Sequence, residues 1–190
     1  MVRFLGDCEQ LLKNDGVLIL AVPDKRFCGD FFRPLTSTGQ IVQAYLEKLD
    51  RHSIGSVFDS WSLLTRNGGL QSWQKNNLPT ELRLCSSPEV ALEKAEAALS
   101  SKDYIDAHEW CFTPSNFRLI FSDLQKLSLS GLQEDKFING LSCEFFVKLR
   151  KNIKNVSDVD RINLSKLCFD ESAAVSPAGL ERIVSGSMSV

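Results

Sequence analysis

The sequence has no long apolar run, no signal-peptide pattern and no excess of positive charge. Its best apolar run, 17–22, has the length of one strand, whereas a membrane-spanning helix needs about 20 residues. The first ten residues mix charged with apolar side chains, unlike a secretory signal. The 22 lysines and arginines are balanced by 24 aspartates and glutamates, and no basic patch is interleaved with aromatic residues. We therefore expect a cytoplasmic protein with no membrane span and no nucleic-acid partner.

Close cysteine pairs are also missing. The six cysteines contain no C-x-x-C pair, and the two histidines, His52 and His108, have one cysteine at metal-ligand spacing, Cys111. A single H-x-x-C pair is weak evidence for a zinc site. Cys111 and Cys143 lie in apolar runs, where a reduced cysteine packs as a small hydrophobic side chain. We expect six free thiols in a reducing compartment and no metal.

Helix and strand patterns alternate along the chain. Hydrophobic residues make up 43% of the sequence, which is enough for one sizeable core. Apolar residues at helical spacing and capping residues predict the helices, and aromatic or β-branched runs predict the strands. The expected elements are a helix over 4–12, a strand over 17–22, a helix capped by Thr38, a helix over 88–99, a helix that begins at Thr113-Pro114, and strands over 131–137 and 143–149 that are joined by a turn with Asn139-Gly140. This order predicts an α/β fold.

The run 17–22 sets the expected architecture. It is apolar at every position, and a strand without alternation is typical of one covered on both faces. We predict a partial Rossmann-like sheet with this buried parallel strand, a terminal antiparallel hairpin and surrounding helices. The segment 53–84 has no sustained period and, with the helix that follows it, predicts a helical insertion over about 53–101. For 151–190 we expect a C-terminal extension with one short helix near 158–169 and a frayed, partly disordered end.

A loop dense in charged and aromatic residues, 23–36, follows the predicted strand. Ligands of open α/β sheets bind beyond the carboxyl ends of the strands, so we expect this loop at a ligand-binding edge. It carries Asp24, Arg26, Asp30 and Arg33. The two guanidinium groups could hold a carboxylate or phosphate of a substrate by paired hydrogen bonds. The alternative is that the two acids and the two arginines pair with one another and fix the loop.

His108 is the plausible general base of the chain, because imidazole exchanges protons near neutral pH. It could deprotonate a hydroxyl or an amine of an acceptor. The alternative is a histidine that orders its own loop by bonding a backbone carbonyl. His52, which follows Asp50-Arg51 just past a predicted helix, is expected at a solvated helix end. The cysteines have no evident histidine partner for nucleophilic catalysis.

The order of these elements resembles the C-terminal half of a class I S-adenosylmethionine-dependent methyltransferase, type 11-like, of the small-molecule kind often found near glycan and lipopolysaccharide genes. The distinctive residues are Pro23-Asp24-Lys25-Arg26 followed by Asp30, Arg33-Pro34 and Thr36, and His108 to Pro114 with Phe117. The likeness covers about residues 1–150, which would form the C-terminal part of a methyltransferase domain. It implies that 17–22 is the fifth strand and that the hairpin supplies strands six and seven, with strand seven antiparallel to its neighbours.

The resemblance also implies S-adenosylmethionine as cofactor and a small polar or glycan-linked acceptor as substrate. In this family a glycine-rich loop after the first strand and an acidic residue after the second bind the cofactor, and these would lie before residue 1. Within the chain, Asn67-Gly68-Gly69 and Gly179 lack the strand–glycine–helix context that such a site needs. We therefore expect no cofactor-binding residue here, and a truncated, substrate-side protein that is inactive alone.

Two functions follow from these patterns. One is a methyltransferase-like chain with Asp24, Arg26, Asp30 and Arg33 on the substrate side and His108 as catalytic base. The other is a non-catalytic binding module that keeps a remnant of the fold. In both, the strand 17–22 lacks a parallel neighbour, and an exposed apolar edge invites pairing with another chain. We predict a dimer or a complementing chain at that edge.

Overall fold

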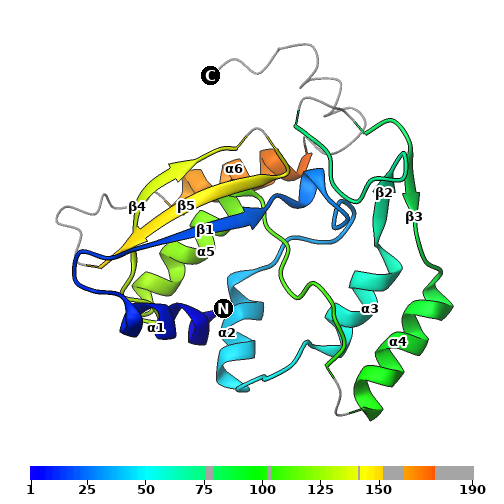
Figure 1. Cartoon of the computed structure of the whole chain (residues 1–190), viewed down its shortest axis with the longest axis horizontal. Helices are drawn as coiled ribbons and strands as arrows, with labels where there is room; N and C mark the ends of the chain where they lie inside the picture. The colour runs from blue at the N-terminus through cyan, green and yellow to red at the C-terminus, as the bar shows by residue number, and fades with distance from the viewer. Residues whose placement is uncertain (76–78, 102–103, 141, 152–160, 174–190) are drawn as a thin grey trace.

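Figure 1 shows a computed structural model of the chain, which describes residues 1–75, 79–101, 104–140, 142–151 and 161–173. The helices are α1 (Val2–Leu11), α2 (Thr38–Leu46), α3 (Ile54–Ser62), α4 (Pro88–Ser100), α5 (Pro114–Lys126) and α6 (Arg161–Ala173), and the strands are β1 (Val17–Pro23), β2 (Thr65–Asn67), β3 (Leu82–Leu84), β4 (Gln133–Ile138) and β5 (Glu144–Arg150). Helices and strands are mixed along the chain, consistent with the predicted α/β class. No helix within the described ranges is long and apolar enough to cross a bilayer.

The main sheet has the order β1-β5-β4, with β5 antiparallel to both neighbours. Val147 of β5 lies opposite Leu20 of β1 on one side and Phe137 of β4 on the other. The predicted hairpin is confirmed, and each of its strands begins one or two residues later than expected. At Gly140 a Cβ atom would lie 2.5 Å from the Glu144 carbonyl oxygen, so this position of the turn needs glycine.

β1 differs from its prediction. Its ladder within the described residues is antiparallel and runs to β5 alone, which leaves its other edge free. Val17 is 39% exposed and Ile19 is 63% exposed, so the strand is not buried on both faces. Exposed positions alternate along β1, so one face of the strand is uncovered, and the expectation of a parallel strand covered on both faces is wrong for these residues. The predicted exposed apolar edge is present.

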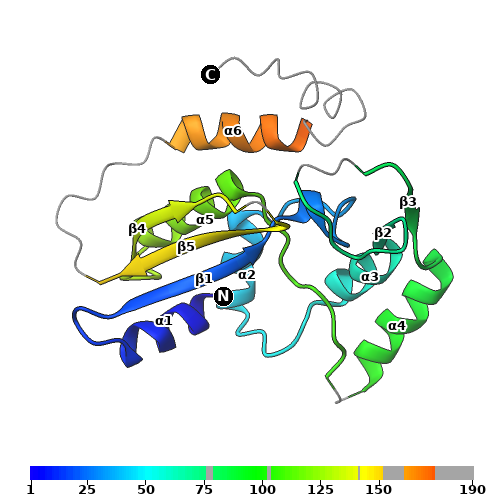
Figure 2. The same cartoon turned by 45° about the horizontal axis from the view of Figure 1, so that its top comes forward.

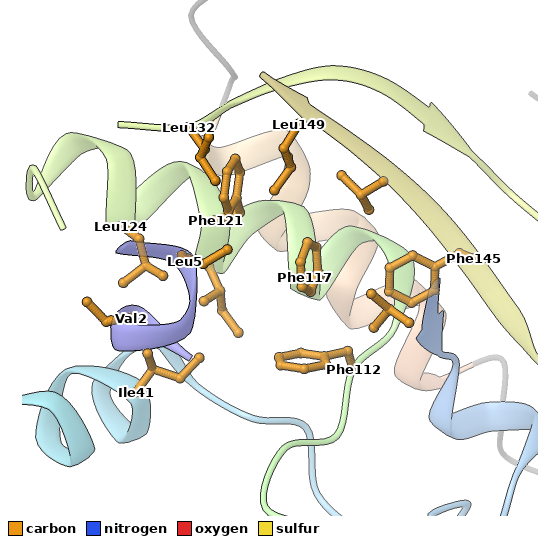
Figure 3. Close-up of a cluster of buried hydrophobic side chains, with 13 residues drawn as sticks. Val2, Leu5, Ile41, Phe112, Phe117, Phe121, Leu124, Leu132, Phe145 and Leu149 are labelled. Atoms are coloured by element: carbon orange, nitrogen blue, oxygen red, sulfur yellow. The ribbon is translucent and has the colours of Figure 1, made fainter. Parts of the chain in front are cut away.

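The main core lies between this sheet and the helices α1, α2 and α5 (Figure 3). β5 alternates strictly, so that Phe145, Val147 and Leu149 are fully buried on one face. They meet the apolar face of α5, where the Phe117 ring lies 5.8 Å from that of Phe145 and stacks on Phe121 at 6.2 Å. This packing holds the carboxyl end of β1 beside the segment that precedes α5.

Local capping explains where the helices begin. Ser37, rather than the predicted Thr38, caps α2: its hydroxyl accepts a hydrogen bond from the Gln40 backbone N–H at 3.2 Å, and the Gln40 side chain accepts one from the Ser37 N–H at 2.8 Å. Thr38 instead donates to Asp123 Oδ2 at 2.8 Å and links α2 to α5. The predicted helices that start at Pro88 and Pro114 are confirmed.

The segment 53–101 folds beside the main sheet, as Figure 2 shows. It contains α3 and α4, which pack against each other, and the short antiparallel pair β2–β3. α3 is not among the expected elements, although Ile54, Val57, Phe58 and Trp61 lie at helical spacing; the signal is only nine residues long and is lost over the longer segment 53–84. Ser53 caps the helix by accepting from the Ser56 N–H at 3.1 Å.

α6 runs close to the predicted range of 158–169 and packs against α5. Arg161 at its start donates to Asp123 of α5 at 2.8 Å, and Glu171 near its end accepts from the Ser115 hydroxyl at 2.8 Å. The predicted frayed end at 174–190, which includes Gly179, lies outside the described residues.

Candidate functional site

The loop after β1 is fastened at both ends to the segment that precedes α5. The Lys25 N–H donates to the Phe112 carbonyl at 2.9 Å, next to an isolated parallel bridge between Asp24 and Phe112. At the other end, the Thr36 N–H donates to the Cys111 carbonyl at 3.0 Å, and the Cys111 N–H donates to the Thr36 hydroxyl at 2.9 Å. These bonds place the middle of the loop against His108, which lies 78 positions from Asp30 in the chain.

The first acid–arginine pair of the loop is largely buried. Asp24 is fully buried and accepts from Arg26 Nε at 2.9 Å and Nη2 at 2.7 Å, and Lys75 Nζ lies 3.7 Å from the same carboxylate. Burial opposes the charge of Arg26, but its bonds to Asp24 outweigh burial and raise the arginine pKa. The pair satisfies a buried carboxylate and fixes the start of the loop.

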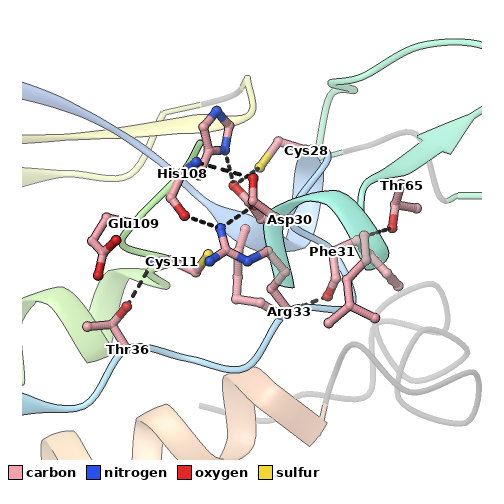
Figure 4. Close-up of polar contacts among 12 residues, drawn as sticks. Cys28, Asp30, Phe31, Arg33, Thr36, Thr65, His108, Glu109 and Cys111 are labelled. Atoms are coloured by element: carbon pink, nitrogen blue, oxygen red, sulfur yellow. Dashed lines mark hydrogen bonds and ion pairs between the residues drawn. The ribbon is translucent and has the colours of Figure 1, made fainter. Parts of the chain in front are cut away.

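The second pair forms a ring with the predicted base (Figure 4). Asp30 Oδ2 lies 2.6 Å from His108 Nδ1, and Asp30 Oδ1 accepts from Arg33 Nη1 at 3.0 Å. The same Nη1 donates to the His108 backbone carbonyl at 2.6 Å. Three residues from two distant segments are thus joined by three contacts. Arg33 is 4% exposed, whereas the side chain of His108 is 62% exposed.

The charges of this ring support one another. Burial raises the pKa of Asp30, but the bonds from His108 and Arg33 outweigh burial and lower it. The bond to Asp30 raises the pKa of His108 above its ordinary value of 6.5, against burial and the Arg33 charge. An ionised carboxylate only accepts hydrogen bonds, so Nδ1 of the imidazole carries a proton. In neutral His108 the lone pair is then on Nε2, which is free to accept a proton.

A cavity of about 460 Å³ lies beside this ring. Most of its wall is apolar and comes from α1, the end of β1, Trp110, Phe112 and α5. Its polar wall includes Lys25, Asp30 and His108. A mostly apolar space of this size with a few convergent polar groups is typical of a small-molecule site.

Lys25 is a site residue that sequence reasoning missed. It is 8% exposed, its Nζ donates to the Phe31 carbonyl at 2.7 Å, and burial lowers its pKa. In the sequence it is one of several charged residues in a loop, where lysine is most often solvated. Only the fold turns its side chain inward toward the cavity.

The second histidine also belongs to this region, and its predicted place at a solvated helix end is wrong. α2 ends at Leu46, and the His52 side chain is only 19% exposed. Its Nδ1 lies 3.3 Å from Glu109 Oε2, and its Nε2 lies 2.8 Å from the Tyr104 hydroxyl. His52 and Glu109 both line the cavity. The tertiary contact with 104–109 brings this histidine inward.

The structure brings the predicted site residues together in two groups. The acids and arginines pair with one another, which is the alternative interpretation of the loop, and His108 bonds the Asp30 carboxylate rather than a backbone carbonyl. Asp30 and His108 line the cavity. The predicted roles of Asp24, Arg26, Asp30 and Arg33 in substrate binding, and of His108 in catalysis, stay predictions.

The glycine turn at 67–69 does not fit S-adenosylmethionine. Gly68 and Gly69 have φ angles of 54° and 91°, but they form a tight turn in which the Asn67 N–H donates to the Leu70 carbonyl at 2.9 Å, and no helix follows it. A glycine turn holds a nucleotide when it leads from a strand directly into a helix whose N-terminus faces the ligand. We therefore derive no step through this cofactor.

The cysteines form no disulfide bond, and burial keeps some of their thiols protonated. All six are free, and burial raises the pKa of the Cys28 thiol to about 12, which keeps it protonated and unreactive. Among the residues that the structure describes, no group of three or more histidine, cysteine or acidic side chains is placed to hold a metal ion. No protein-family model, curated protein or solved structure matches the chain.

Proposed function

We propose that this chain is the acceptor-side part of a class I methyltransferase that acts on a small polar or glycan-linked acceptor. In this proposal the cavity beside β1 holds the acceptor, and His108 removes its proton. The observation that carries the proposal is the Asp30–His108 contact of 2.6 Å at the mouth of this cavity. A carboxylate that orients an imidazole toward a ligand-sized space is the arrangement of a general base.

The strand order supports the family. The resemblance implies a last strand that is antiparallel to its neighbours, and β5 lies between β1 and β4 and is antiparallel to both. In this interpretation β1 is the last strand of the parallel part, and the sheet is Rossmann-like once a parallel strand adds to its free edge. The half-exposed apolar residues of β1 suit such an addition.

The chemistry assigned to this chain is a proton transfer. An acceptor hydroxyl or amine becomes a better nucleophile when a base takes its proton, and Nε2 of neutral His108 has the free lone pair. The proton is then held on Nε2 of His108, and Asp30 stabilises the imidazolium that forms. Methyl transfer also needs S-adenosylmethionine, which we assign to a part of the enzyme other than the described residues, paired with β1.

The test is methyl transfer by the protein as it exists in its source cells. The tagged chain is isolated together with whatever it binds, and transfer of a radiolabelled methyl group from S-adenosylmethionine to sugars and glycans is measured. We expect transfer by the intact assembly and its loss in a His108→Gln variant. Arg118→Gln is the control, because Arg118 also bonds a carboxylate, that of Glu134 at 2.8 Å, but does not line the cavity.

The outcomes separate the two functions. Label transfer that depends on His108 supports the methyltransferase. An assembly that transfers no methyl group to any acceptor, with or without His108, contradicts it and supports the non-catalytic module. Binding of S-adenosylmethionine by the isolated chain, measured by calorimetry, would instead overturn the division into acceptor and donor parts.

A further inference from the structure

We propose that Arg33 is a positioning residue that holds Asp30 and His108 in register, and that it is not a substrate-binding arginine. The proposal deepens the proposed function, since it says how the base is oriented. It stands on the geometry of the ring, which can be tested without methyl transfer. It replaces the substrate role that the sequence suggested for this arginine.

The contacts show how Arg33 acts on both partners. Both of its bonds start from one nitrogen, Nη1, which has two hydrogens: one is directed to Asp30 Oδ1 at 3.0 Å and the other to the His108 carbonyl at 2.6 Å. The first bond fixes the carboxylate that receives the imidazole N–H. The second fixes the backbone from which the imidazole extends. Arg33 therefore sets both ends of the 2.6 Å contact between Asp30 and His108.

The burial of the Arg33 side chain favours a positioning role over substrate binding. Arg33 is 4% exposed and its Nε is buried with no hydrogen-bond partner among the described groups. The cavity wall includes Asp30 and His108, and Arg33 is not part of it. A guanidinium that binds a substrate anion presents its paired N–H groups to the ligand, as a fork. Here Nη1 is already directed at two protein acceptors, and Nε is buried.

Removal of Arg33 should change the pKa of His108 in opposite directions, depending on whether Arg33 acts through its charge or through its position. Asp30 raises the pKa of His108, whereas the positive charge of Arg33 lowers it, and Asp106 also raises it. Lys25, His52 and Glu109 line the same cavity as His108. If Arg33 acts through its charge alone, its removal raises the His108 pKa. If it holds Asp30 against the imidazole, its removal loosens that contact and lowers the His108 pKa. The sign of the shift decides between the two.

The experiment is an NMR titration of the histidine side chains in the isolated chain. The sequence has two histidines, so the signals of His108 are identified by their loss in His108→Gln. We expect Arg33→Met to lower the pKa of His108. We expect Arg33→Lys to keep most of the wild-type value, because a lysine ammonium can donate to both acceptors from one nitrogen.

Arg26→Met is the matched control. It removes an arginine of the same loop that is also bonded to an aspartate, but Arg26 does not contact His108. It should leave the pKa of His108 unchanged. A rise of the His108 pKa in Arg33→Met would overturn the proposal, and so would an equal fall in both methionine variants.

A measurement on the unsubstituted protein covers the case in which Arg33→Met does not fold. The Nη signals of Arg33 should titrate with the same midpoint as the His108 imidazole, since the two residues share Asp30. Arg33 signals that do not respond to this titration would contradict the proposal. Failure of methyl transfer alone would contradict the proposed function and leave the ring intact.

Discussion

The loop after β1 contains two acid–arginine pairs that have the same residue types but different roles. Asp24 and Arg26 are two positions apart, the carboxylate is fully buried, and its further partner is a second cation, Lys75, at 3.7 Å. Asp30 and Arg33 are three positions apart, but both also bond His108, which comes from another part of the chain, beside a cavity. A buried ion pair whose added partner is another cation away from the cavity serves the fold, whereas one that bonds a histidine at a cavity can serve chemistry.

The largest expected effect comes from Asp30→Asn in the second pair. An amide cannot stabilise the imidazolium, and the pKa of His108 loses its main upward contribution. We expect methyl transfer by the isolated assembly to fall by about 100- to 10,000-fold, the usual contribution of a general base. Steady-state kinetics measure it, and most of the loss should be in kcat. An unchanged kcat in Asp30→Asn would show that the second pair, like the first, has only a structural role.

Asp24→Ala in the first pair should affect stability instead. It leaves the Arg26 guanidinium, whose side chain is 14% exposed, without its carboxylate. Breaking a buried pair by removal of one partner costs about 3–5 kcal/mol of unfolding free energy. Urea denaturation of the isolated chain measures this loss. Asp30→Asn is the comparison variant, and a larger loss of stability for it than for Asp24→Ala would reverse the assignment of the two pairs.

The pH dependence of methyl transfer should report the second pair alone. A general base acts when deprotonated, so the rate should rise with pH through the pKa of His108, which Asp30 raises above 6.5. Below that pKa the rate should fall about tenfold per pH unit, because the fraction of neutral imidazole does so. In Arg26→Met the midpoint should not move. A midpoint below 6.5 in the wild type would contradict the role of Asp30.

The smallest effect on the isolated chain is expected at the free edge of β1. Ile19→Lys places a charge at a position that is already 63% exposed, so the unfolding free energy should change by less than about 0.5 kcal/mol. The same change should prevent a strand from adding to this edge, and methyl transfer should be lost through loss of the donor-binding part. Leu99→Lys is the control, because Leu99 is an apolar residue of α4 that is 74% exposed. Equal retention of the donor-binding part by both variants would exclude the β1 edge as its attachment.

The methyltransferase resemblance was available from short sequence segments, but the site geometry was not. Asp30 and His108 each stood out by chemistry, and their separation of 78 positions gave no sign that they touch. The charged neighbours of His52 in sequence predict an exposed side chain, whereas the folded chain places it in contact with Tyr104 and Glu109. Sequence patterns report local neighbours, and these contacts are made by segments that meet only after folding.

The features that can be predicted from sequence patterns are local: the helices that begin at Pro88 and Pro114, the hairpin β4–β5, and an apolar β1 with a charged loop after it. Capping residues, proline and hydrophobic period act over a few positions, so they can be recognised without the fold. Three other features depend on folding: the free edge of β1, the direction of the Lys25 side chain, and the bonds of Arg33 to both Asp30 and His108. Those outcomes depend on burial and on contacts between distant segments, where a buried charge must find its partner wherever the packed core places it.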